Sequence, residues 1–130
     1  MGGIRTLAYI YFNNNPVEES RGDCVIRAIS KALNQSWDIT YWDLCDSGFL
    51  LGDWGSSNLV WDTYLRDCGF KRKVIPDTCP NCYTVRDFCR DNPYGTYILA
   101  TGNHTVCAID GSYFDSWDSG SEPIIYYYKR

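Results

Sequence analysis

Apolar and polar residues follow two different spacings along this chain of 130 residues. From residue 25 to residue 33 the apolar side chains recur every three or four positions, which is typical of a helix that buries one face. Beyond Gly95 they alternate with polar ones, which is typical of half-buried strands. The pattern predicts the α+β fold class, with N-terminal helices packed on a C-terminal antiparallel sheet in a single domain, residues 1–130.

Three further helices are predicted. Each begins at a Ser or Thr that can cap its first turn and ends at a Gly or a Pro, where helices commonly stop. Their expected limits are, in chain order, Ser36 to Gly48, Ser56 or Ser57 to Gly69, and Thr84 to residues 92–93.

Short apolar runs between turn residues predict the strands. These runs are residues 6–12, 70–75, 97–101, 104–109, 112–117 and 124–128. The last four follow one another closely, so we expect them to form an antiparallel meander. The basic cluster at residues 71–73 is expected to be the solvent-facing side of a strand, without a function of its own.

The dipeptide Asp110-Gly111 is a strong hairpin signal, because both residues tolerate the positive φ of a type I′ turn. The register that this turn sets pairs Ile109 with Ser112, Val106 with Asp115, and His104 with Trp117. His104 is the only histidine of the chain, and it then lies diagonally from Asp115 on one face of the sheet. That is the spacing of a catalytic base and the carboxylate that orients it. Strict alternation puts Asp118 on the opposite face of the sheet from His104. A single bulge would reverse the faces, so that Asp118 and not Asp115 would share the face of His104.

Cys24 is predicted to lie in the first turn of the first helix, with Asp23 as the capping residue. The positive end of a helix lowers the pKa of a thiol, and a neighbouring imidazole lowers it further. Taken alone, Cys24 reads as an ordinary buried thiol. Together with His104 and Asp115 it predicts a nucleophile, a base and an orienting acid.

The chain resembles papain-like cysteine peptidases in the order of these residues. In that family a cysteine at a helix start is followed by a histidine at the opening of a strand and then by a carboxylate on the next strand. Four segments resemble small papain-like proteins of Firmicutes and their phages, which are known as predicted peptidases. They are residues 22–28 (GDCVIRA), 57–61 (SNLVW), 95–100 (GTYILA) and 110–120 (DGSYFDSWDSG). The resemblance implies a papain-like fold over most of the chain and a Cys24-His104-Asp115 triad, but no particular substrate.

One element of the papain pattern is missing. A glutamine several residues before the nucleophile usually donates to the oxyanion, whereas Glu18 stands six residues before Cys24 and is an acceptor when ionised. The backbone N–H of Cys24 can still donate. A side-chain amide from residues 13–15 could supply the second donor, and Asn14 is the residue we favour for this role.

Charge and composition limit the classes of partner that we expect the protein to bind. The chain has 12 basic and 16 acidic residues and a net charge of −4, which is a poor match to the phosphates of nucleic acid. It opens without a secretory signal pattern and has no apolar run of bilayer-spanning length, so we expect a cytoplasmic protein that contacts no membrane. The seven cysteines are an odd number, which together with this location predicts reduced thiols.

A rival site is the Cys-x-x-Cys sequence at Cys79 and Cys82. With Cys68 and Cys89 it could supply four thiolates to a structural zinc ion. Zinc signatures usually pair two such sequences, however, and here the outer cysteines fit the predicted helices as core residues. The triad interpretation uses no metal and no cofactor.

Three classes of function therefore remain. The first is a papain-like thiol hydrolase, a peptidase, isopeptidase or amidase that acts on a peptide or protein through a thioester. The second is a catalytically inactive papain-like module that binds a host protein. The third is a structural protein stabilised by zinc at Cys79 and Cys82.

Overall fold

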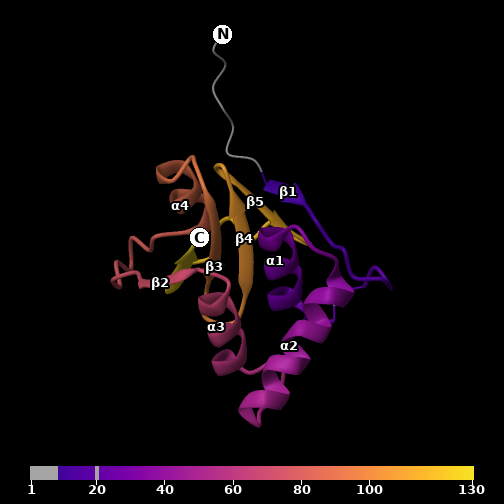
Figure 1. Ribbon diagram of the computed structural model, residues 1–130. Coiled ribbons are helices and arrows are strands. Elements are labelled where there is room, and N and C mark those ends of the chain that lie inside the picture. Colours follow the sequence, from indigo (N-terminus) through magenta and orange to yellow (C-terminus); the bar gives the residue numbers. More distant parts are fainter. Residues whose placement is uncertain (1–8, 20) are drawn as a thin grey trace.

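The computed structural model describes residues 9–19 and 21–130 (Figure 1). The helices of this part are α1 (Cys24–Leu33), α2 (Trp37–Leu51), α3 (Asn58–Asp67) and α4 (Val85–Asp91). The strands are β1 (Tyr9–Tyr11), β2 (Lys71–Val74), β3 (Thr96–Ala100), β4 (Thr105–Ile109), β5 (Ser112–Asp115) and β6 (Tyr126–Lys129). Because α1, α2 and α3 precede most of the sheet, the predicted α+β class is confirmed. Residues 6–8 of the first predicted strand lie outside the described residues.

The six strands form one sheet in the order β1-β5-β4-β3-β6-β2. β1 runs parallel to β5, and the other neighbours are antiparallel, so the sheet is mixed and not wholly antiparallel as predicted. The predicted meander is right for β3, β4 and β5 but wrong for β6, which pairs with β3. The free edge of β5 is taken by β1, and the chain returns through Ile125, whose N–H donates to Ala100 O at 2.8 Å, to place β6 on the far side of β3.

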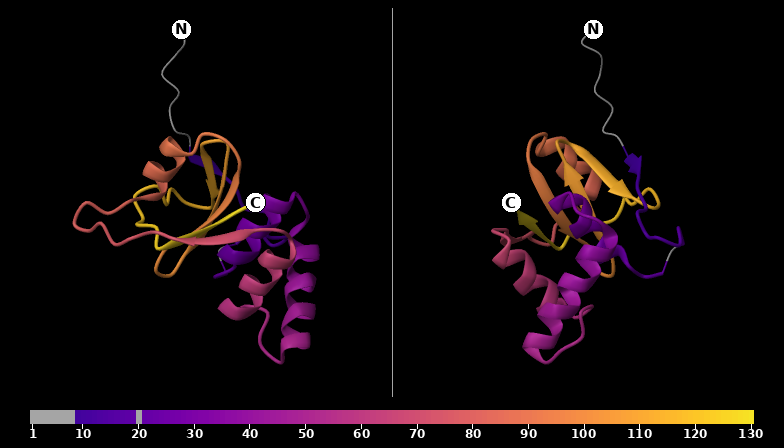
Figure 2. Two further views of the ribbon diagram at one scale, coloured as in Figure 1. Left: turned by 60° about the vertical axis from the view of Figure 1, so that its left-hand side comes forward. Right: turned by 45° about the vertical axis from the view of Figure 1, so that its right-hand side comes forward.

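Helices cover both faces of the sheet, as the two views of Figure 2 show. The strand β3 contributes to each side in turn: Ile98 and Ala100 belong to the core under α1, α2 and α3, whereas Tyr97 and Leu99 belong to the core under α4. This alternation is the two-residue period of a strand with both faces buried. The sheet is therefore the middle layer of three.

The β4–β5 hairpin has the register that its sequence predicts. Asp110 and Gly111 have φ values of 50° and 82°, as a type I′ turn requires, and Ile109 pairs with Ser112. This pairing fixes which residues meet at the other end of the hairpin, where His104 precedes β4 and Asp115 closes β5.

Two helix boundaries show where the capping signals worked and where they failed. α4 begins with the predicted capping box, in which Thr84 and Asp87 each bond the other's backbone N–H. α2 does not end at Gly48, as predicted, but continues to Leu51 and is closed by Gly52, whose φ is 70°. Gly48 is instead buried, with the chain after α2 folded back on it. No helix in the described part of the chain has both the length and the apolar character needed to cross a membrane.

The close approach at Gly48 gives a test of this packing. A Cβ added at this position would lie 2.6 Å from the backbone oxygen of Asp53 and 3.0 Å from the backbone nitrogen of Gly55, so the loop must shift. We expect Gly48→Ala to lower the free energy of unfolding in urea by about 1–3 kcal/mol. The neighbouring change Ser47→Ala, a control for helix propensity, should stay within about 0.5 kcal/mol of the parent. Equal stability of the two variants would contradict this packing.

Candidate active site

The three residues predicted to carry chemistry meet where α1 packs on the hairpin. Cys24 is the first residue of α1, and α1 lies against β4 and β5. His104 immediately precedes β4, and Asp115 is the last residue of β5. The structure therefore brings together side chains that are eighty and eleven positions apart in the sequence.

The ring of His104 is held by a buried carboxylate. Its Nε2 lies 2.5 Å from Oδ2 of Asp115, and the two side chains are only 10% and 2% exposed. The same carboxylate accepts from the hydroxyl of Ser119 at 2.6 Å and from the backbone N–H of Ser116 at 2.8 Å. The ring of Trp117 packs beside the imidazole, with 4.9 Å between centroids. These contacts fix the orientation of the imidazole. Because Nε2 is bonded to Asp115, Nδ1 is the ring nitrogen left to exchange a proton with the thiol of Cys24.

The thiol of Cys24 is half-buried, and the ring of His104 and the backbone of Thr105 lie close enough to stabilise its charged form. Burial by itself raises the pKa of a thiol, but these interactions and the charge of the imidazolium outweigh it, so the pKa of Cys24 lies below its ordinary value. Burial likewise opposes charge on the ring, yet its bonds to Asp115 and Cys24 raise the pKa of His104 to about 9. The two shifts together favour the thiolate–imidazolium pair over the neutral thiol and ring.

Asp118, the alternative orienting acid, is engaged elsewhere. Its Oδ1 accepts from the hydroxyl of Tyr113 at 2.5 Å and lies 3.6 Å from the guanidinium of Arg86. The acid that contacts His104 in the structure is Asp115, which is the one that strict alternation along the hairpin favours.

A buried arginine that sequence reasoning missed connects the helix start to the hairpin. Arg27 is 5% exposed, and its guanidinium pairs with Asp23 on one side and lies 3.6 Å from Oδ1 of Asp115 on the other. Its positive charge also contributes to the lowered pKa of Cys24. A basic residue among the apolar positions of α1, four residues after an acid, was the signal in the sequence that could have identified it.

Asp23 occupies the N-cap position of α1 but does not cap it, which corrects the prediction. Its carboxylate is turned inward and accepts from Trp37 Nε1 at 2.8 Å, from Asn15 Nδ2 at 3.0 Å and from Arg27. Because no described side chain caps this helix, the first N–H groups of α1, including that of Cys24, remain available beside the sulfur. A helix start of this kind favours negative charge.

Asn14, the residue favoured as a second oxyanion donor, lies elsewhere on α1. Its Nδ2 donates to the hydroxyl of Ser30 at 2.8 Å, so the amide is held six residues along the helix from Cys24. Asn15 donates to Asp23. In the structure both amides are thus engaged by other side chains.

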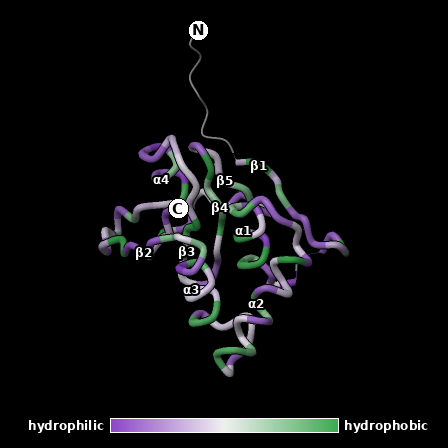
Figure 3. Tube along the Cα trace, viewed as in Figure 1, coloured by the Kyte–Doolittle hydropathy of each residue, from purple (hydrophilic) through white to green (hydrophobic). Residues whose placement is uncertain are grey.

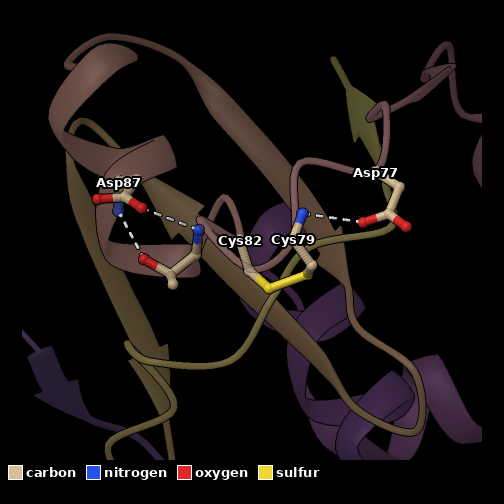
Figure 4. Close-up of a disulfide and its surroundings, with 5 residues drawn as sticks. Asp77, Cys79, Cys82 and Asp87 are labelled. Atoms are coloured by element: carbon tan, nitrogen blue, oxygen red, sulfur yellow. Dashed lines mark hydrogen bonds between the residues drawn. A yellow bond between two sulfur atoms is a disulfide. The ribbon is translucent and has the colours of Figure 1, made fainter.

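The four cysteines considered for zinc do not come together. Cys79 and Cys82 form a disulfide in an exposed loop, where Asp77 accepts from the backbone N–H of Cys79 (Figure 4). Cys68 packs with the core under α1, α2 and α3, whereas Cys89 is buried in the core under α4, so the sheet separates them. Residues 9–19 and 21–130 contain no group of three or more side chains able to hold a metal ion. The zinc alternative and the expectation that this pair is reduced are both wrong for this structure.

Comparison of the chain with protein-family models, with curated proteins and with solved structures finds no match. The similarity to papain-like peptidases therefore stays a prediction from the sequence. The arguments about function that follow depend on the geometry around Cys24.

The pairing of Arg27 with two buried acids predicts a large effect on stability. We expect Arg27→Met, which keeps the apolar stem but leaves the buried Asp23 without a counter-charge and Asp115 with that of His104 alone, to lower the free energy of unfolding in urea by about 3–5 kcal/mol. The matched control is Arg66→Met, because Arg66 pairs with Asp62 at the same four-residue spacing but is 54% exposed. There we expect a loss below about 1 kcal/mol. Similar losses in both variants would contradict a special role of the buried pair.

Proposed function

We propose that this protein is a papain-like thiol hydrolase, a peptidase, isopeptidase or amidase, that acts on a peptide or protein in the cytoplasm. The observation that carries the proposal is the chain of contacts from Cys24 through the ring of His104 to the buried carboxylate of Asp115. A nucleophile, a base and an orienting acid in contact are the parts of a Cys-His-Asp triad.

The first half of the proposed reaction forms a thioester. The enzyme starts with the Cys24 proton on His104, and the thiolate attacks the acyl carbon of the substrate. A carbon–sulfur bond forms while the π electrons of the carbonyl move to its oxygen. The uncapped N–H of Cys24 at the start of α1 is the donor available to that oxyanion. As the carbonyl re-forms, the carbon–nitrogen bond breaks and the amine leaves with the proton from His104.

The second half returns the enzyme to its starting state. Water gives a proton to the neutral His104 while its oxygen bonds to the acyl carbon of the thioester. The carbon–sulfur bond then breaks, the acid departs, and the thiolate and imidazolium are restored. Asp115 accepts a hydrogen bond from Nε2 throughout, which keeps Nδ1 directed at the sulfur and stabilises the charged ring. The cycle uses no cofactor.

The second candidate is an inactive papain-like module that binds a host protein. The placement of Asn14 on Ser30 favours this alternative, because neither this amide nor that of Asn15 reinforces the backbone donor at Cys24. An exposed apolar surface is also present: Phe49 and Leu50 near the end of α2 are 85% and 82% exposed, and this segment is coloured as hydrophobic in Figure 3.

Selective alkylation and hydrolysis together distinguish the two candidates. Near neutral pH, iodoacetamide should modify Cys24 at least about tenfold faster than the other free thiols, because an ordinary thiol is only a few per cent ionised there. His104→Ala should abolish this preference. Peptide mapping by mass spectrometry measures both rates, and Cys45, a half-buried free thiol, is the internal reference.

Hydrolysis is measured with a library of peptidyl aminomethylcoumarin amides. The parent protein should release the coumarin, Cys24→Ala should not, and Cys45→Ala should behave as the parent. The rate should fall as the pH rises through about 9, because above its pKa His104 has no proton for the leaving amine. A reactive Cys24 that hydrolyses no member of the library would favour the binding module, and equal labelling of all thiols would contradict the triad.

A further inference from the structure

The outer face of α2 carries large apolar side chains that water reaches. They are Ile39, Trp42, Phe49 and Leu50, which are 53%, 64%, 85% and 82% exposed. At 100° per residue these positions fall within about 100° of one another around the helix, so they form one stripe about 16 Å long. We call these four residues the outer stripe. The helix that carries them extends beyond the sheet, at the end of the molecule opposite α4 (Figures 1 and 2).

The opposite face of α2 holds the helix on the protein. Its buried residues are Thr40, Leu44 and Gly48, so packing of the helix does not use the outer stripe. A surface helix normally keeps polar residues on the face that water reaches. Single exposed apolar residues are ordinary, but a contiguous group of them marks a surface that binds a partner.

The C-terminal end of the outer stripe borders a hollow that suits an anchoring side chain. This hollow has a volume of about 550 Å³ and is lined by Gly48, Phe49, Gly52, Asp53 and Trp54. Trp54 is 81% exposed, and the two glycines bring no side chain that would fill the space. An apolar side chain from a partner would cover both aromatic rings there. Contacts of this kind supply much of the affinity of protein interfaces.

The charges around the outer stripe are all negative. Asp46 lies within the stripe on the helix surface, Asp38 lies at its border, and both are exposed. Residues 32–65 contain no lysine or arginine. The nearest bases in the sequence are engaged elsewhere, because Lys31 packs over two phenylalanine rings and Arg66 is in an ion pair within α3. Among the described residues, neither of the two acids is in an ion pair.

This charge decides between the possible occupants. A second copy of the chain, docked symmetrically through the same face, would set acids against acids without a base between them. An anionic membrane surface would repel the same carboxylates. A partner that carries lysine or arginine beside its apolar side chains would instead gain from both acids.

From these observations we infer that the outer stripe binds an amphipathic helix of another protein, with an apolar face flanked by lysine or arginine. A helix fits because its backbone groups are bonded internally and need no partner on α2. The long stems of its basic residues would lie along the apolar stripe and bring their charges to Asp46 and Asp38. The inference does not depend on the chemistry of Cys24.

The test uses three labelled peptides of about 18 residues. The first has leucines at helical spacing on one face and lysines beside that face. The second has glutamates in place of the lysines, and the third has the composition of the first in an order that forms no apolar face. Fluorescence anisotropy measures binding to the full chain with Cys24→Ala, so that the proposed hydrolase does not cleave them. The first peptide should bind at least about tenfold more tightly than either of the others.

Two pairs of variants assign this binding to the outer stripe. Phe49→Ala should weaken binding of the lysine peptide at least about tenfold. Its control is Tyr94→Ala, which removes an aromatic side chain that is 79% exposed outside α2 and should stay within about twofold of the parent. Asp46→Asn should weaken binding about threefold, whereas Asp77→Asn, at an exposed acid in the loop before α4, should not change it.

Several results would overturn the inference. Equal affinity for the lysine peptide and either of the others would do so, as would equal affinity of Phe49→Ala and Tyr94→Ala or of Asp46→Asn and Asp77→Asn. A dimer of the protein alone that Phe49→Ala dissociates, seen by analytical ultracentrifugation, would assign the stripe to a second copy. Sedimentation with vesicles of phosphatidylcholine and phosphatidylserine that is lost in Phe49→Ala would assign it to a membrane.

Discussion

The hydrogen bond between His104 and Asp115 is the interaction on which the candidate site depends. It is 2.5 Å long and closes the open end of the β4–β5 hairpin, where a free carboxylate would otherwise be buried. Asp115 in turn accepts from Ser119 and the backbone of Ser116, so its charge is satisfied on several sides. A ring held in this way can present only one nitrogen to Cys24, which converts a half-buried thiol into a group with a lowered pKa.

Arg27 links α1 to the β4–β5 hairpin and so holds the two elements in place relative to each other. Its guanidinium lies between Asp23 at the start of α1 and Asp115 at the end of β5, and all three side chains are buried. The same contacts draw the carboxylate of Asp23 away from the helix end, so the N–H groups around Cys24 stay uncapped. A single buried charge therefore contacts both acids, leaves the N–H groups at the start of α1 uncapped and adds to the effect of His104 in lowering the pKa of the Cys24 thiol.

Features that depend on neighbouring residues in the sequence were predicted better than features that depend on contacts between distant segments. Asp110 and Gly111 set the hairpin register by themselves, and that register alone brought His104 to Asp115. The partner of β6 could not be predicted in this way, because it depends on which edge of the sheet β1 has already taken. Gly48 failed as a helix terminator because its small size serves the packing of the following loop, a contact that no sequence spacing reveals. The inward turn of Asp23 likewise required knowledge of where its three donors lie.

Titration of the His104 ring by nuclear magnetic resonance tests the central claim most directly, because the only histidine of the chain gives a signal that needs no assignment. The account predicts a ring that stays protonated through neutral pH and titrates with a pKa of about 9, and a lower pKa when Cys24 is replaced by Ala. The fall is expected because the thiolate that stabilises the imidazolium is then gone. A ring that titrates near 6.5, unchanged by the loss of Cys24, would show that thiol, imidazole and carboxylate do not act as one unit.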